Sequence, residues 1–130
     1  MLKPDQRYPR ACRLVRGADF DRVYRRRATA SDGVLLVFAD RNGLPHSRLG
    51  LSVSRKVGGA VVRNRWKRRL REAFRLNQSN LPPGIDLIVI PRAADGPSRT
   101  GDPSRAGELS FDVLAKSLVR LAARAERKLT

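Results

Sequence analysis

The densest chemical signal in this sequence is a run of cations between residues 55 and 75. Nine of its 21 residues are Lys or Arg and only Glu72 is acidic, which gives the segment a net charge of +8. Arginine predominates, and its planar guanidinium pairs with phosphate oxygens in a bidentate manner. A solvated basic helix face is the alternative, but like charges one turn apart destabilise a helix that lacks acidic partners. The run therefore predicts a surface for the phosphate backbone of a nucleic acid.

A second group of interest is formed by three of the seven aromatic residues, Phe20, Tyr24 and Phe38. Aromatic side chains on a surface stack against unpaired bases, and arginines follow directly at residues 25–27. Packing in the core is the commoner role for such residues, and composition alone favours it. Both interpretations stay open on the residues themselves.

Residues suited to catalysis or metal binding are scarce. The single histidine, His46, lies beside Pro45 without a second histidine or a cysteine nearby. Asp19 and Asp21 would point about 200° apart on a helix and cannot share a metal ion. The pair Gly58-Gly59 is too short for a phosphate-binding loop of the Gly-rich type. We predict no catalytic and no metal-binding side chain.

Length and charge restrict the class of protein. The chain has 130 residues, a formal charge of +16 and 41% hydrophobic residues, which indicates one domain with a modest core and a polyanionic partner. Nucleic acid is the first candidate and an anionic membrane the second. The lone Cys12 excludes an internal disulfide and fits a reducing compartment. Neither an export signal nor a membrane span is expected, because no apolar stretch is long enough.

Hydrophobic periodicity predicts the elements that must position these residues. A short helix starts at Gly17, and strands are expected at residues 34–39 and 49–53. We expect these two strands to pair in antiparallel fashion across a loose loop that contains Asn42-Gly43. Residues 85–90 form an apolar run that predicts a central strand, parallel to the strand at 49–53.

The longest predicted helix spans residues 60–76. One apolar stripe runs along it, and an opposite face carries a polar row. The stripe consists of Val62, Trp66, Leu70, Ala73 and Phe74, and the polar row of Asn64, Arg68, Arg71 and Arg75. A final helix is predicted at residues 111–125. Residues 1–12 read as a flexible basic arm, and residues 93–107 as a surface loop insertion.

The segment from Arg48 to Arg75 closely resembles the signature of the bacterial ribonuclease P protein component. It reads RLGLSVSRKVGGAVVRNRWKRRLREAFR, and its Arg63-Asn64-Arg65 core with a basic continuation is the hallmark of that family. Further matches bring the resemblance to about residues 13–92 and 108–125. Gly59 stands where the family commonly has Asn, Pro91 stands where Ala is usual, and the 93–107 loop is longer than typical.

The resemblance implies a single small α+β domain over residues 13–128. Its elements would follow the order α-β-β-α-β-α, with a left-handed βαβ crossover as in the second domain of ribosomal protein S5. The family acts as a subunit of ribonuclease P, an endoribonuclease whose catalyst is an RNA that removes the 5′ leader of precursor tRNA. The implied partners are that RNA and precursor tRNA, with no membrane and no required protein partner. The implied cofactor is Mg2+, bound mainly by the RNA subunit and substrate, and the location is cytoplasmic.

The resemblance also implies roles for individual residues. The face toward the catalytic RNA would consist of Arg63, Asn64, Arg65, Lys67, Arg68 and Arg71. The leader would lie on Phe20, Tyr24 and Phe38, with Arg55 and Lys56 nearby. The basic segment Arg25–Arg27 has no role assigned by the resemblance. A ribosomal or other structural RNA-binding protein is the alternative class.

Overall fold

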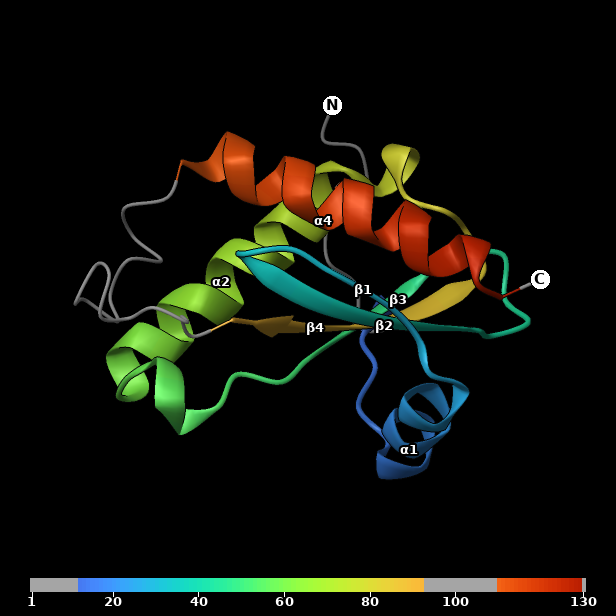
Figure 1. Cartoon of the computed structure of the whole chain (residues 1–130), viewed down its shortest axis with the longest axis horizontal. Coiled ribbons are helices and arrows are strands. Elements are labelled where there is room, and N and C mark those ends of the chain that lie inside the picture. The colour runs from blue at the N-terminus through green and yellow to red at the C-terminus, as the bar shows by residue number, and fades with distance from the viewer. Residues whose placement is uncertain (1–11, 93–109, 130) are drawn as a thin grey trace.

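The structure is a computed structural model, and it describes residues 12–92 and 110–129 (Figure 1). In chain order its elements are α1 (Gly17–Arg26), β1 (Ala28–Ser31), β2 (Leu35–Arg41), β3 (Arg48–Leu51), η3 (Arg55–Val57), α2 (Ala60–Leu76), η4 (Gln78–Asn80), β4 (Ile85–Pro91) and α4 (Phe111–Arg127). The predicted α+β class is confirmed, as are the predicted helices at α1, α2 and α4. The expected arm at residues 1–12 and loop at residues 93–107 fall almost wholly outside the described residues, but Cys12 itself is buried.

The strands form one mixed sheet in the order β1-β2-β4-β3. β4 is parallel to β3 and antiparallel to β2, so the predicted central position of residues 85–90 is confirmed. The predicted antiparallel pairing of residues 34–39 with 49–53 is wrong, because β4 lies between these strands. A strand that is apolar on both faces is best buried between two neighbours. The loop between β2 and β3 is long enough to pass over one strand, which is about 5 Å wide.

The strand β1 was not predicted and extends the element order to α-β-β-β-α-β-α. Its residues, Ala-Thr-Ala-Ser, are small and have weak β propensity. Pairing with β2 creates the strand, in a register from Ala28 opposite Ala39 to Ser31 opposite Leu36. The turn that follows is fixed by Asp32, whose Oδ1 accepts hydrogen bonds from the backbone N–H groups of Val34 and Leu35 at 2.8 and 2.9 Å.

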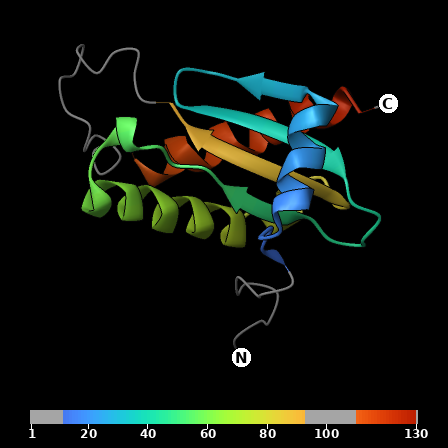
Figure 2. The ribbon, with the colours of Figure 1, turned by 90° about the horizontal axis from the view of Figure 1, so that it is seen from below.

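The helices divide between the two faces of the sheet. α4 packs on β1 and β2, α2 packs against α4, and α1 alone covers part of the opposite face (Figures 1 and 2). The main core contains alternate residues of the two central strands, among them Leu35, Val37, Leu87 and Val89. Within the described part of the chain, no helix is long and apolar enough to cross a membrane.

Candidate functional site

The basic helix α2 begins at a tight backbone turn. Gly58 has a φ of 146°, and a Cβ at this position would lie 2.9 Å from the Cβ of Val62. A side chain is therefore disfavoured there both by the backbone and by the close approach of the helix. Ser54 accepts a hydrogen bond from the backbone N–H of Lys56 and caps η3, which leads into the turn. Local sequence thus sets where the cationic helix starts.

The predicted stripe and the predicted polar row lie on different sides of α2. Of the predicted stripe, Trp66, Leu70, Ala73 and Phe74 are buried, whereas Val62 in the first turn is half-buried. Of the residues that the sequence assigns to RNA binding, Asn64, Arg65, Arg68 and Arg71 are exposed, whereas Arg63 and Lys67 are half-buried. The helix therefore presents most of the predicted residues to solvent while its apolar side is held in the core. This arrangement leaves the guanidinium groups accessible to phosphates.

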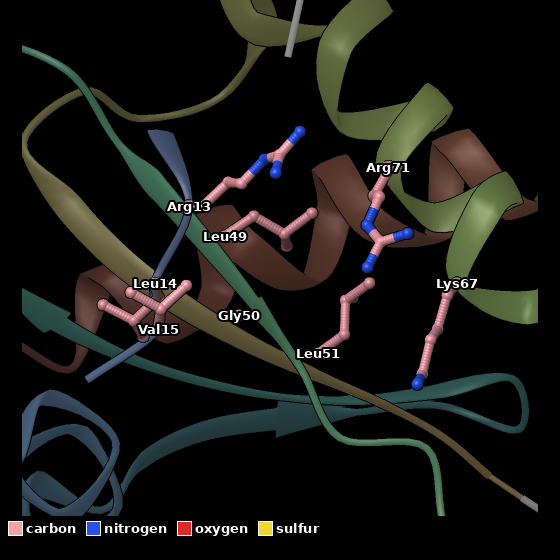
Figure 3. A pocket seen from close by; sticks show the side chains of 8 residues that line it. All are labelled: Arg13, Leu14, Val15, Leu49, Gly50, Leu51, Lys67 and Arg71. Atoms are coloured by element: carbon pink, nitrogen blue, oxygen red, sulfur yellow. The ribbon is translucent and has the colours of Figure 1, made fainter. Parts of the chain in front are cut away.

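A small open pocket of about 160 Å³ lies between α2 and the edge strand β3 (Figure 3). Lys67 and Arg71 line it from α2, and Leu49 and Leu51 line it from β3. Arg13 forms a parallel bridge with Leu49, and this places its side chain across the pocket from Arg71. Arg13 was not predicted as a site residue, because its position depends on pairing with a distant strand. The pocket joins an apolar floor to cationic walls.

The three predicted aromatic residues come together on the sheet face that α1 covers. The ring centroids of Phe20 and Tyr24 are 6.4 Å apart, and those of Tyr24 and Phe38 are 4.9 Å apart in an edge-to-face arrangement. All three side chains are half-buried and pack against buried Val23 and Ile88. The cluster is therefore partly core and partly surface, so ring atoms stay accessible for stacking.

Gly50 makes room for this cluster. A Cβ at Gly50 would lie 2.7 Å from the Cζ of Phe20 and 3.1 Å from Leu14. A side chain at position 50 would therefore push the Phe20 ring away from the sheet. The glycine thus connects the edge strand beside α2 with the aromatic cluster under α1.

A buried ionic network fixes α1 on the same face. Asp86 of β4 is fully buried and accepts hydrogen bonds from Arg48 Nε at 2.7 Å, from Asn42 Nδ2 at 2.9 Å and from Arg22 Nη2. Arg22 also donates to Asp40 at 2.8 Å. Burial raises the pKa of Asp86, but hydrogen bonds from Arg48, Asn42 and Arg22 outweigh it and lower the pKa below its ordinary value. The network is a structural clamp whose carboxylates are already paired with guanidinium groups.

The remaining predicted residues lie elsewhere. Arg55 and Lys56 are exposed on η3, and Figure 2 shows η3 at the end of the sheet away from α1. His46 is half-buried in the β2–β3 loop, where its carbonyl oxygen accepts a hydrogen bond from Asn42 Nδ2 at 3.1 Å. Among the described residues, no group of three or more His, Cys, Asp or Glu side chains is placed to hold a metal ion.

Comparisons with known proteins agree with the resemblance seen in the sequence. The family model named Ribonuclease P matches residues 8–126. A ribonuclease P protein component from Clostridium acetobutylicum is 41% identical over 92 residues, which cover 69% of this chain and 77% of that protein. One from Caldanaerobacter subterraneus is 36% identical over 109 residues, which cover 84% of each chain.

Solved structures show the same fold. The ribonuclease P protein of Thermotoga maritima superimposes with a TM-score of 0.73 at 32% identity, covering 86% of this chain and 96% of that one. The Staphylococcus aureus ribonuclease P protein superimposes with a TM-score of 0.70 at 31% identity, covering 90% of this chain and 97% of that one. The similarity therefore extends over nearly the whole length of both solved chains.

Proposed function

The chain belongs to the bacterial ribonuclease P protein family, and on this premise we propose that it binds both the catalytic RNA and the 5′ leader of precursor tRNA. As a member of this family it is the protein component of an endoribonuclease that processes tRNA. The exposed cationic face of α2 binds the catalytic RNA, and the aromatic cluster of Phe20, Tyr24 and Phe38 binds the leader.

The observation that carries this proposal is the difference between the two sides of α2, of which one is apolar and buried and the other cationic and exposed. Its apolar side, with Trp66 and Leu70, is buried, so the helix is fixed to the domain. Its exposed side presents Arg65, Arg68 and Arg71 to solvent. A row of arginines on a rigid helix neutralises several phosphates at once and releases their counterions. This release supplies affinity without recognition of the bases. A folded RNA presents closely spaced phosphates of this kind.

The aromatic cluster supports the second part of the proposal. Half-exposed rings offer faces on which unpaired bases stack, and stacking tolerates any sequence. A leader is a single strand whose sequence differs between tRNA precursors, so a binding mode that does not read bases suits it. Mature tRNA lacks these nucleotides. Contacts at Tyr24 and Phe38 therefore favour precursor over product and promote release after cleavage.

Catalysis is assigned to the RNA, with magnesium held by the RNA and the substrate. Among the described residues, Asp19, Asp40 and Asp86 do not fit a magnesium site, because Arg22 and Arg48 already pair with them. The protein contributes by binding and orienting the RNAs. We place this activity in the cytoplasm, with precursor tRNA and the catalytic RNA as the only partners required.

Charge reversal on α2 tests the proposal. The double variant Arg68→Glu and Arg71→Glu replaces two exposed residues, so folding should change little. Binding to the catalytic RNA should weaken, and the slope of log K against log salt should fall by about 0.9 per lost phosphate contact. The matched control is Arg41→Glu with Lys116→Glu, which makes the same change in charge at exposed positions outside α2.

Reconstitution with the catalytic RNA at low magnesium completes the test. The parent protein should accelerate leader removal, and the α2 variant should do so only at higher protein concentration. A ribosomal or other structural RNA-binding protein would give no acceleration. Equal salt slopes for the α2 variant and its control would remove α2 from the interface.

A further inference from the structure

The C-terminal ends of α1 and α4 meet at the free edge of β1. Arg26 Nη2 at the end of α1 donates a hydrogen bond to the carbonyl oxygen of Leu129 at 3.2 Å. Lys128 Nζ donates to the carbonyl oxygen of Thr29 in β1. Figure 1 shows the two helices on opposite faces of the sheet, with both of these ends at the opposite end of the long axis from the start of α2, and Figure 2 shows the two ends close together. Two segments far apart in the sequence thus share one surface.

This surface is strongly basic. A hydrogen bond from Arg120 Nη2 to Asp32 Oδ2 at 2.7 Å fixes the rotation of α4, and Arg124 and Arg127 follow Arg120 on the same helix face. We define the β1-edge surface by its five exposed cations, Arg25, Arg27, Arg124, Arg127 and Lys128. Neither the sequence signature nor the proposed function uses any of them.

Arg27 adds a cation at a position that the backbone conformation does not favour for a residue with a side chain. Cations near a helix C-terminus offset the helix dipole, which accounts for one or two of them. Arg27, however, has a φ of 58°, and it is the one residue other than glycine with positive φ in the described ranges 12–92 and 110–129. Glycine is the favoured residue for this left-handed conformation after a helix. Position 27 therefore carries a cation where the backbone conformation would favour glycine.

The β1-edge surface adjoins the aromatic cluster. The backbone N–H of Arg27 donates to the carbonyl oxygen of Tyr24 at 3.2 Å. Thr29, whose carbonyl binds Lys128, lies directly opposite Phe38 in the sheet register. Residues that face each other in an antiparallel pair share a face of the sheet. The β1-edge surface therefore begins beside Tyr24 and continues along the strand that pairs with Phe38.

We propose that the β1-edge surface binds the phosphates of leader nucleotides that extend beyond the aromatic cluster, away from the cleavage site. The inference rests on the proposed function, in which the aromatic cluster holds the nearer leader nucleotides. Stacking platforms followed by a cationic path are how proteins hold single-stranded nucleic acid without reading its sequence. Because α2 begins at the other end of the molecule, a leader that starts near the catalytic RNA reaches the β1 edge last.

A series of leader lengths tests this inference in the reconstituted holoenzyme. Mature tRNA and precursor tRNAs with leaders of up to about 16 nucleotides span the usual site sizes for single strands. For the parent protein, affinity should rise first as the aromatic cluster is occupied and again as the leader reaches the β1 edge. The triple variant Arg25→Gln, Arg27→Gln and Arg124→Gln should lose the second rise and keep the first. Its salt slope for long leaders should fall by roughly 2, at about 0.7 per lost contact with a single strand.

The matched control is Arg16→Gln, Arg41→Gln and Lys116→Gln, which removes three exposed cations elsewhere and should keep both rises. If the triple variant also binds mature tRNA or the catalytic RNA more weakly, the surface contacts another RNA segment and the inference is wrong. An unchanged second rise also overturns it. Loss of the first rise in Tyr24→Ala would still support the proposed function in either case, so the two failures are distinguishable.

Discussion

The two faces of the sheet differ although the same strands form both. Toward α4, alternate residues such as Leu35, Val37 and Leu87 are fully buried. Toward α1, the intervening residues Leu36 and Phe38 remain half-exposed. The α4 side is covered by a helix of 17 residues and the α1 side by one of 10. Incomplete cover on one side leaves aromatic and apolar surface available for a ligand.

Polar chemistry follows the same division. The α1 face holds the buried carboxylate of Asp86, with Arg22 and Arg48 as its partners, whereas its neighbours in β4 that face α4 are apolar. A paired carboxylate fixes the position of α1 with directional bonds, while apolar packing supplies most of the stabilisation on the other side. We conclude that apolar packing on one face stabilises the fold, whereas on the other face directional bonds hold α1 over a partly exposed surface.

The largest expected effect is on the α4 face. Leu87→Ala removes a fully buried side chain and should lower the free energy of unfolding by about 2–5 kcal/mol. Phe38→Ala, on the half-exposed face, should cost less because less of its area is buried. Urea unfolding of both variants measures the difference. Equal losses in the free energy of unfolding would show that the two faces contribute equally to stability, and would contradict the difference drawn between them.

The next largest effect is expected for the ionic network around Asp86, which holds α1 on the sheet. Asp86→Asn should lower stability by about 1.5–3 kcal/mol near neutral pH, since hydrogen bonds to a charged group are lost. Because the folded pKa of Asp86 is lowered, its stabilisation is fully present above the ordinary carboxyl pKa and is lost as pH falls through the folded pKa. The difference in Tm between parent and variant should thus be constant from about pH 5 to 7 and shrink below about pH 4. A difference that does not change with pH would argue against a charged Asp86.

The smallest effect is at the edge of the α1 face. Glycine adopts the left-handed conformation of position 27 without strain, so Arg27→Gly should raise the free energy of unfolding by up to about 1 kcal/mol. The control Arg25→Gly lies inside the last turn of α1 and should lower stability by a similar amount. Thermal melting of both variants shows whether Tm rises for Arg27→Gly and falls for Arg25→Gly. Destabilisation by Arg27→Gly would mean that the arginine side chain is itself a structural contact.

Strong local patterns made part of this fold predictable. The apolar stripe of α2 is regular, and the limits of the helix and its four buried residues follow from the sequence, although Val62 at the start of the stripe is only half-buried. β1 has no such pattern, because Ala28 and Ala30 are defined as strand residues only by pairing with β2. The position of β4 between β2 and β3 depends on which pairing buries more apolar area, and local turn signals favour the wrong answer.

For the candidate site, the sequence predicts which aromatic residues lie close together but not how exposed they are. Phe20 and Tyr24 lie one turn apart on a short helix, so their proximity follows from the sequence. How much of each ring stays accessible depends on how much of the sheet α1 covers and on the space above Gly50, which are tertiary properties. The contacts of Asp86 with Arg22 and Arg48 join residues 64 and 38 positions apart, and no local signal indicates them.

The most direct measurement is the ratio of precursor to mature tRNA affinity in the reconstituted holoenzyme. Tyr24→Ala and Phe38→Ala should each lower precursor affinity by about 1–3 kcal/mol per lost base contact and leave mature tRNA binding at the parent value. Phe111→Ala, a half-buried aromatic on α4, is the control and should leave the ratio unchanged. If Tyr24→Ala and Phe38→Ala keep the parent ratio and melt much earlier, the aromatic cluster is core and the leader binds elsewhere.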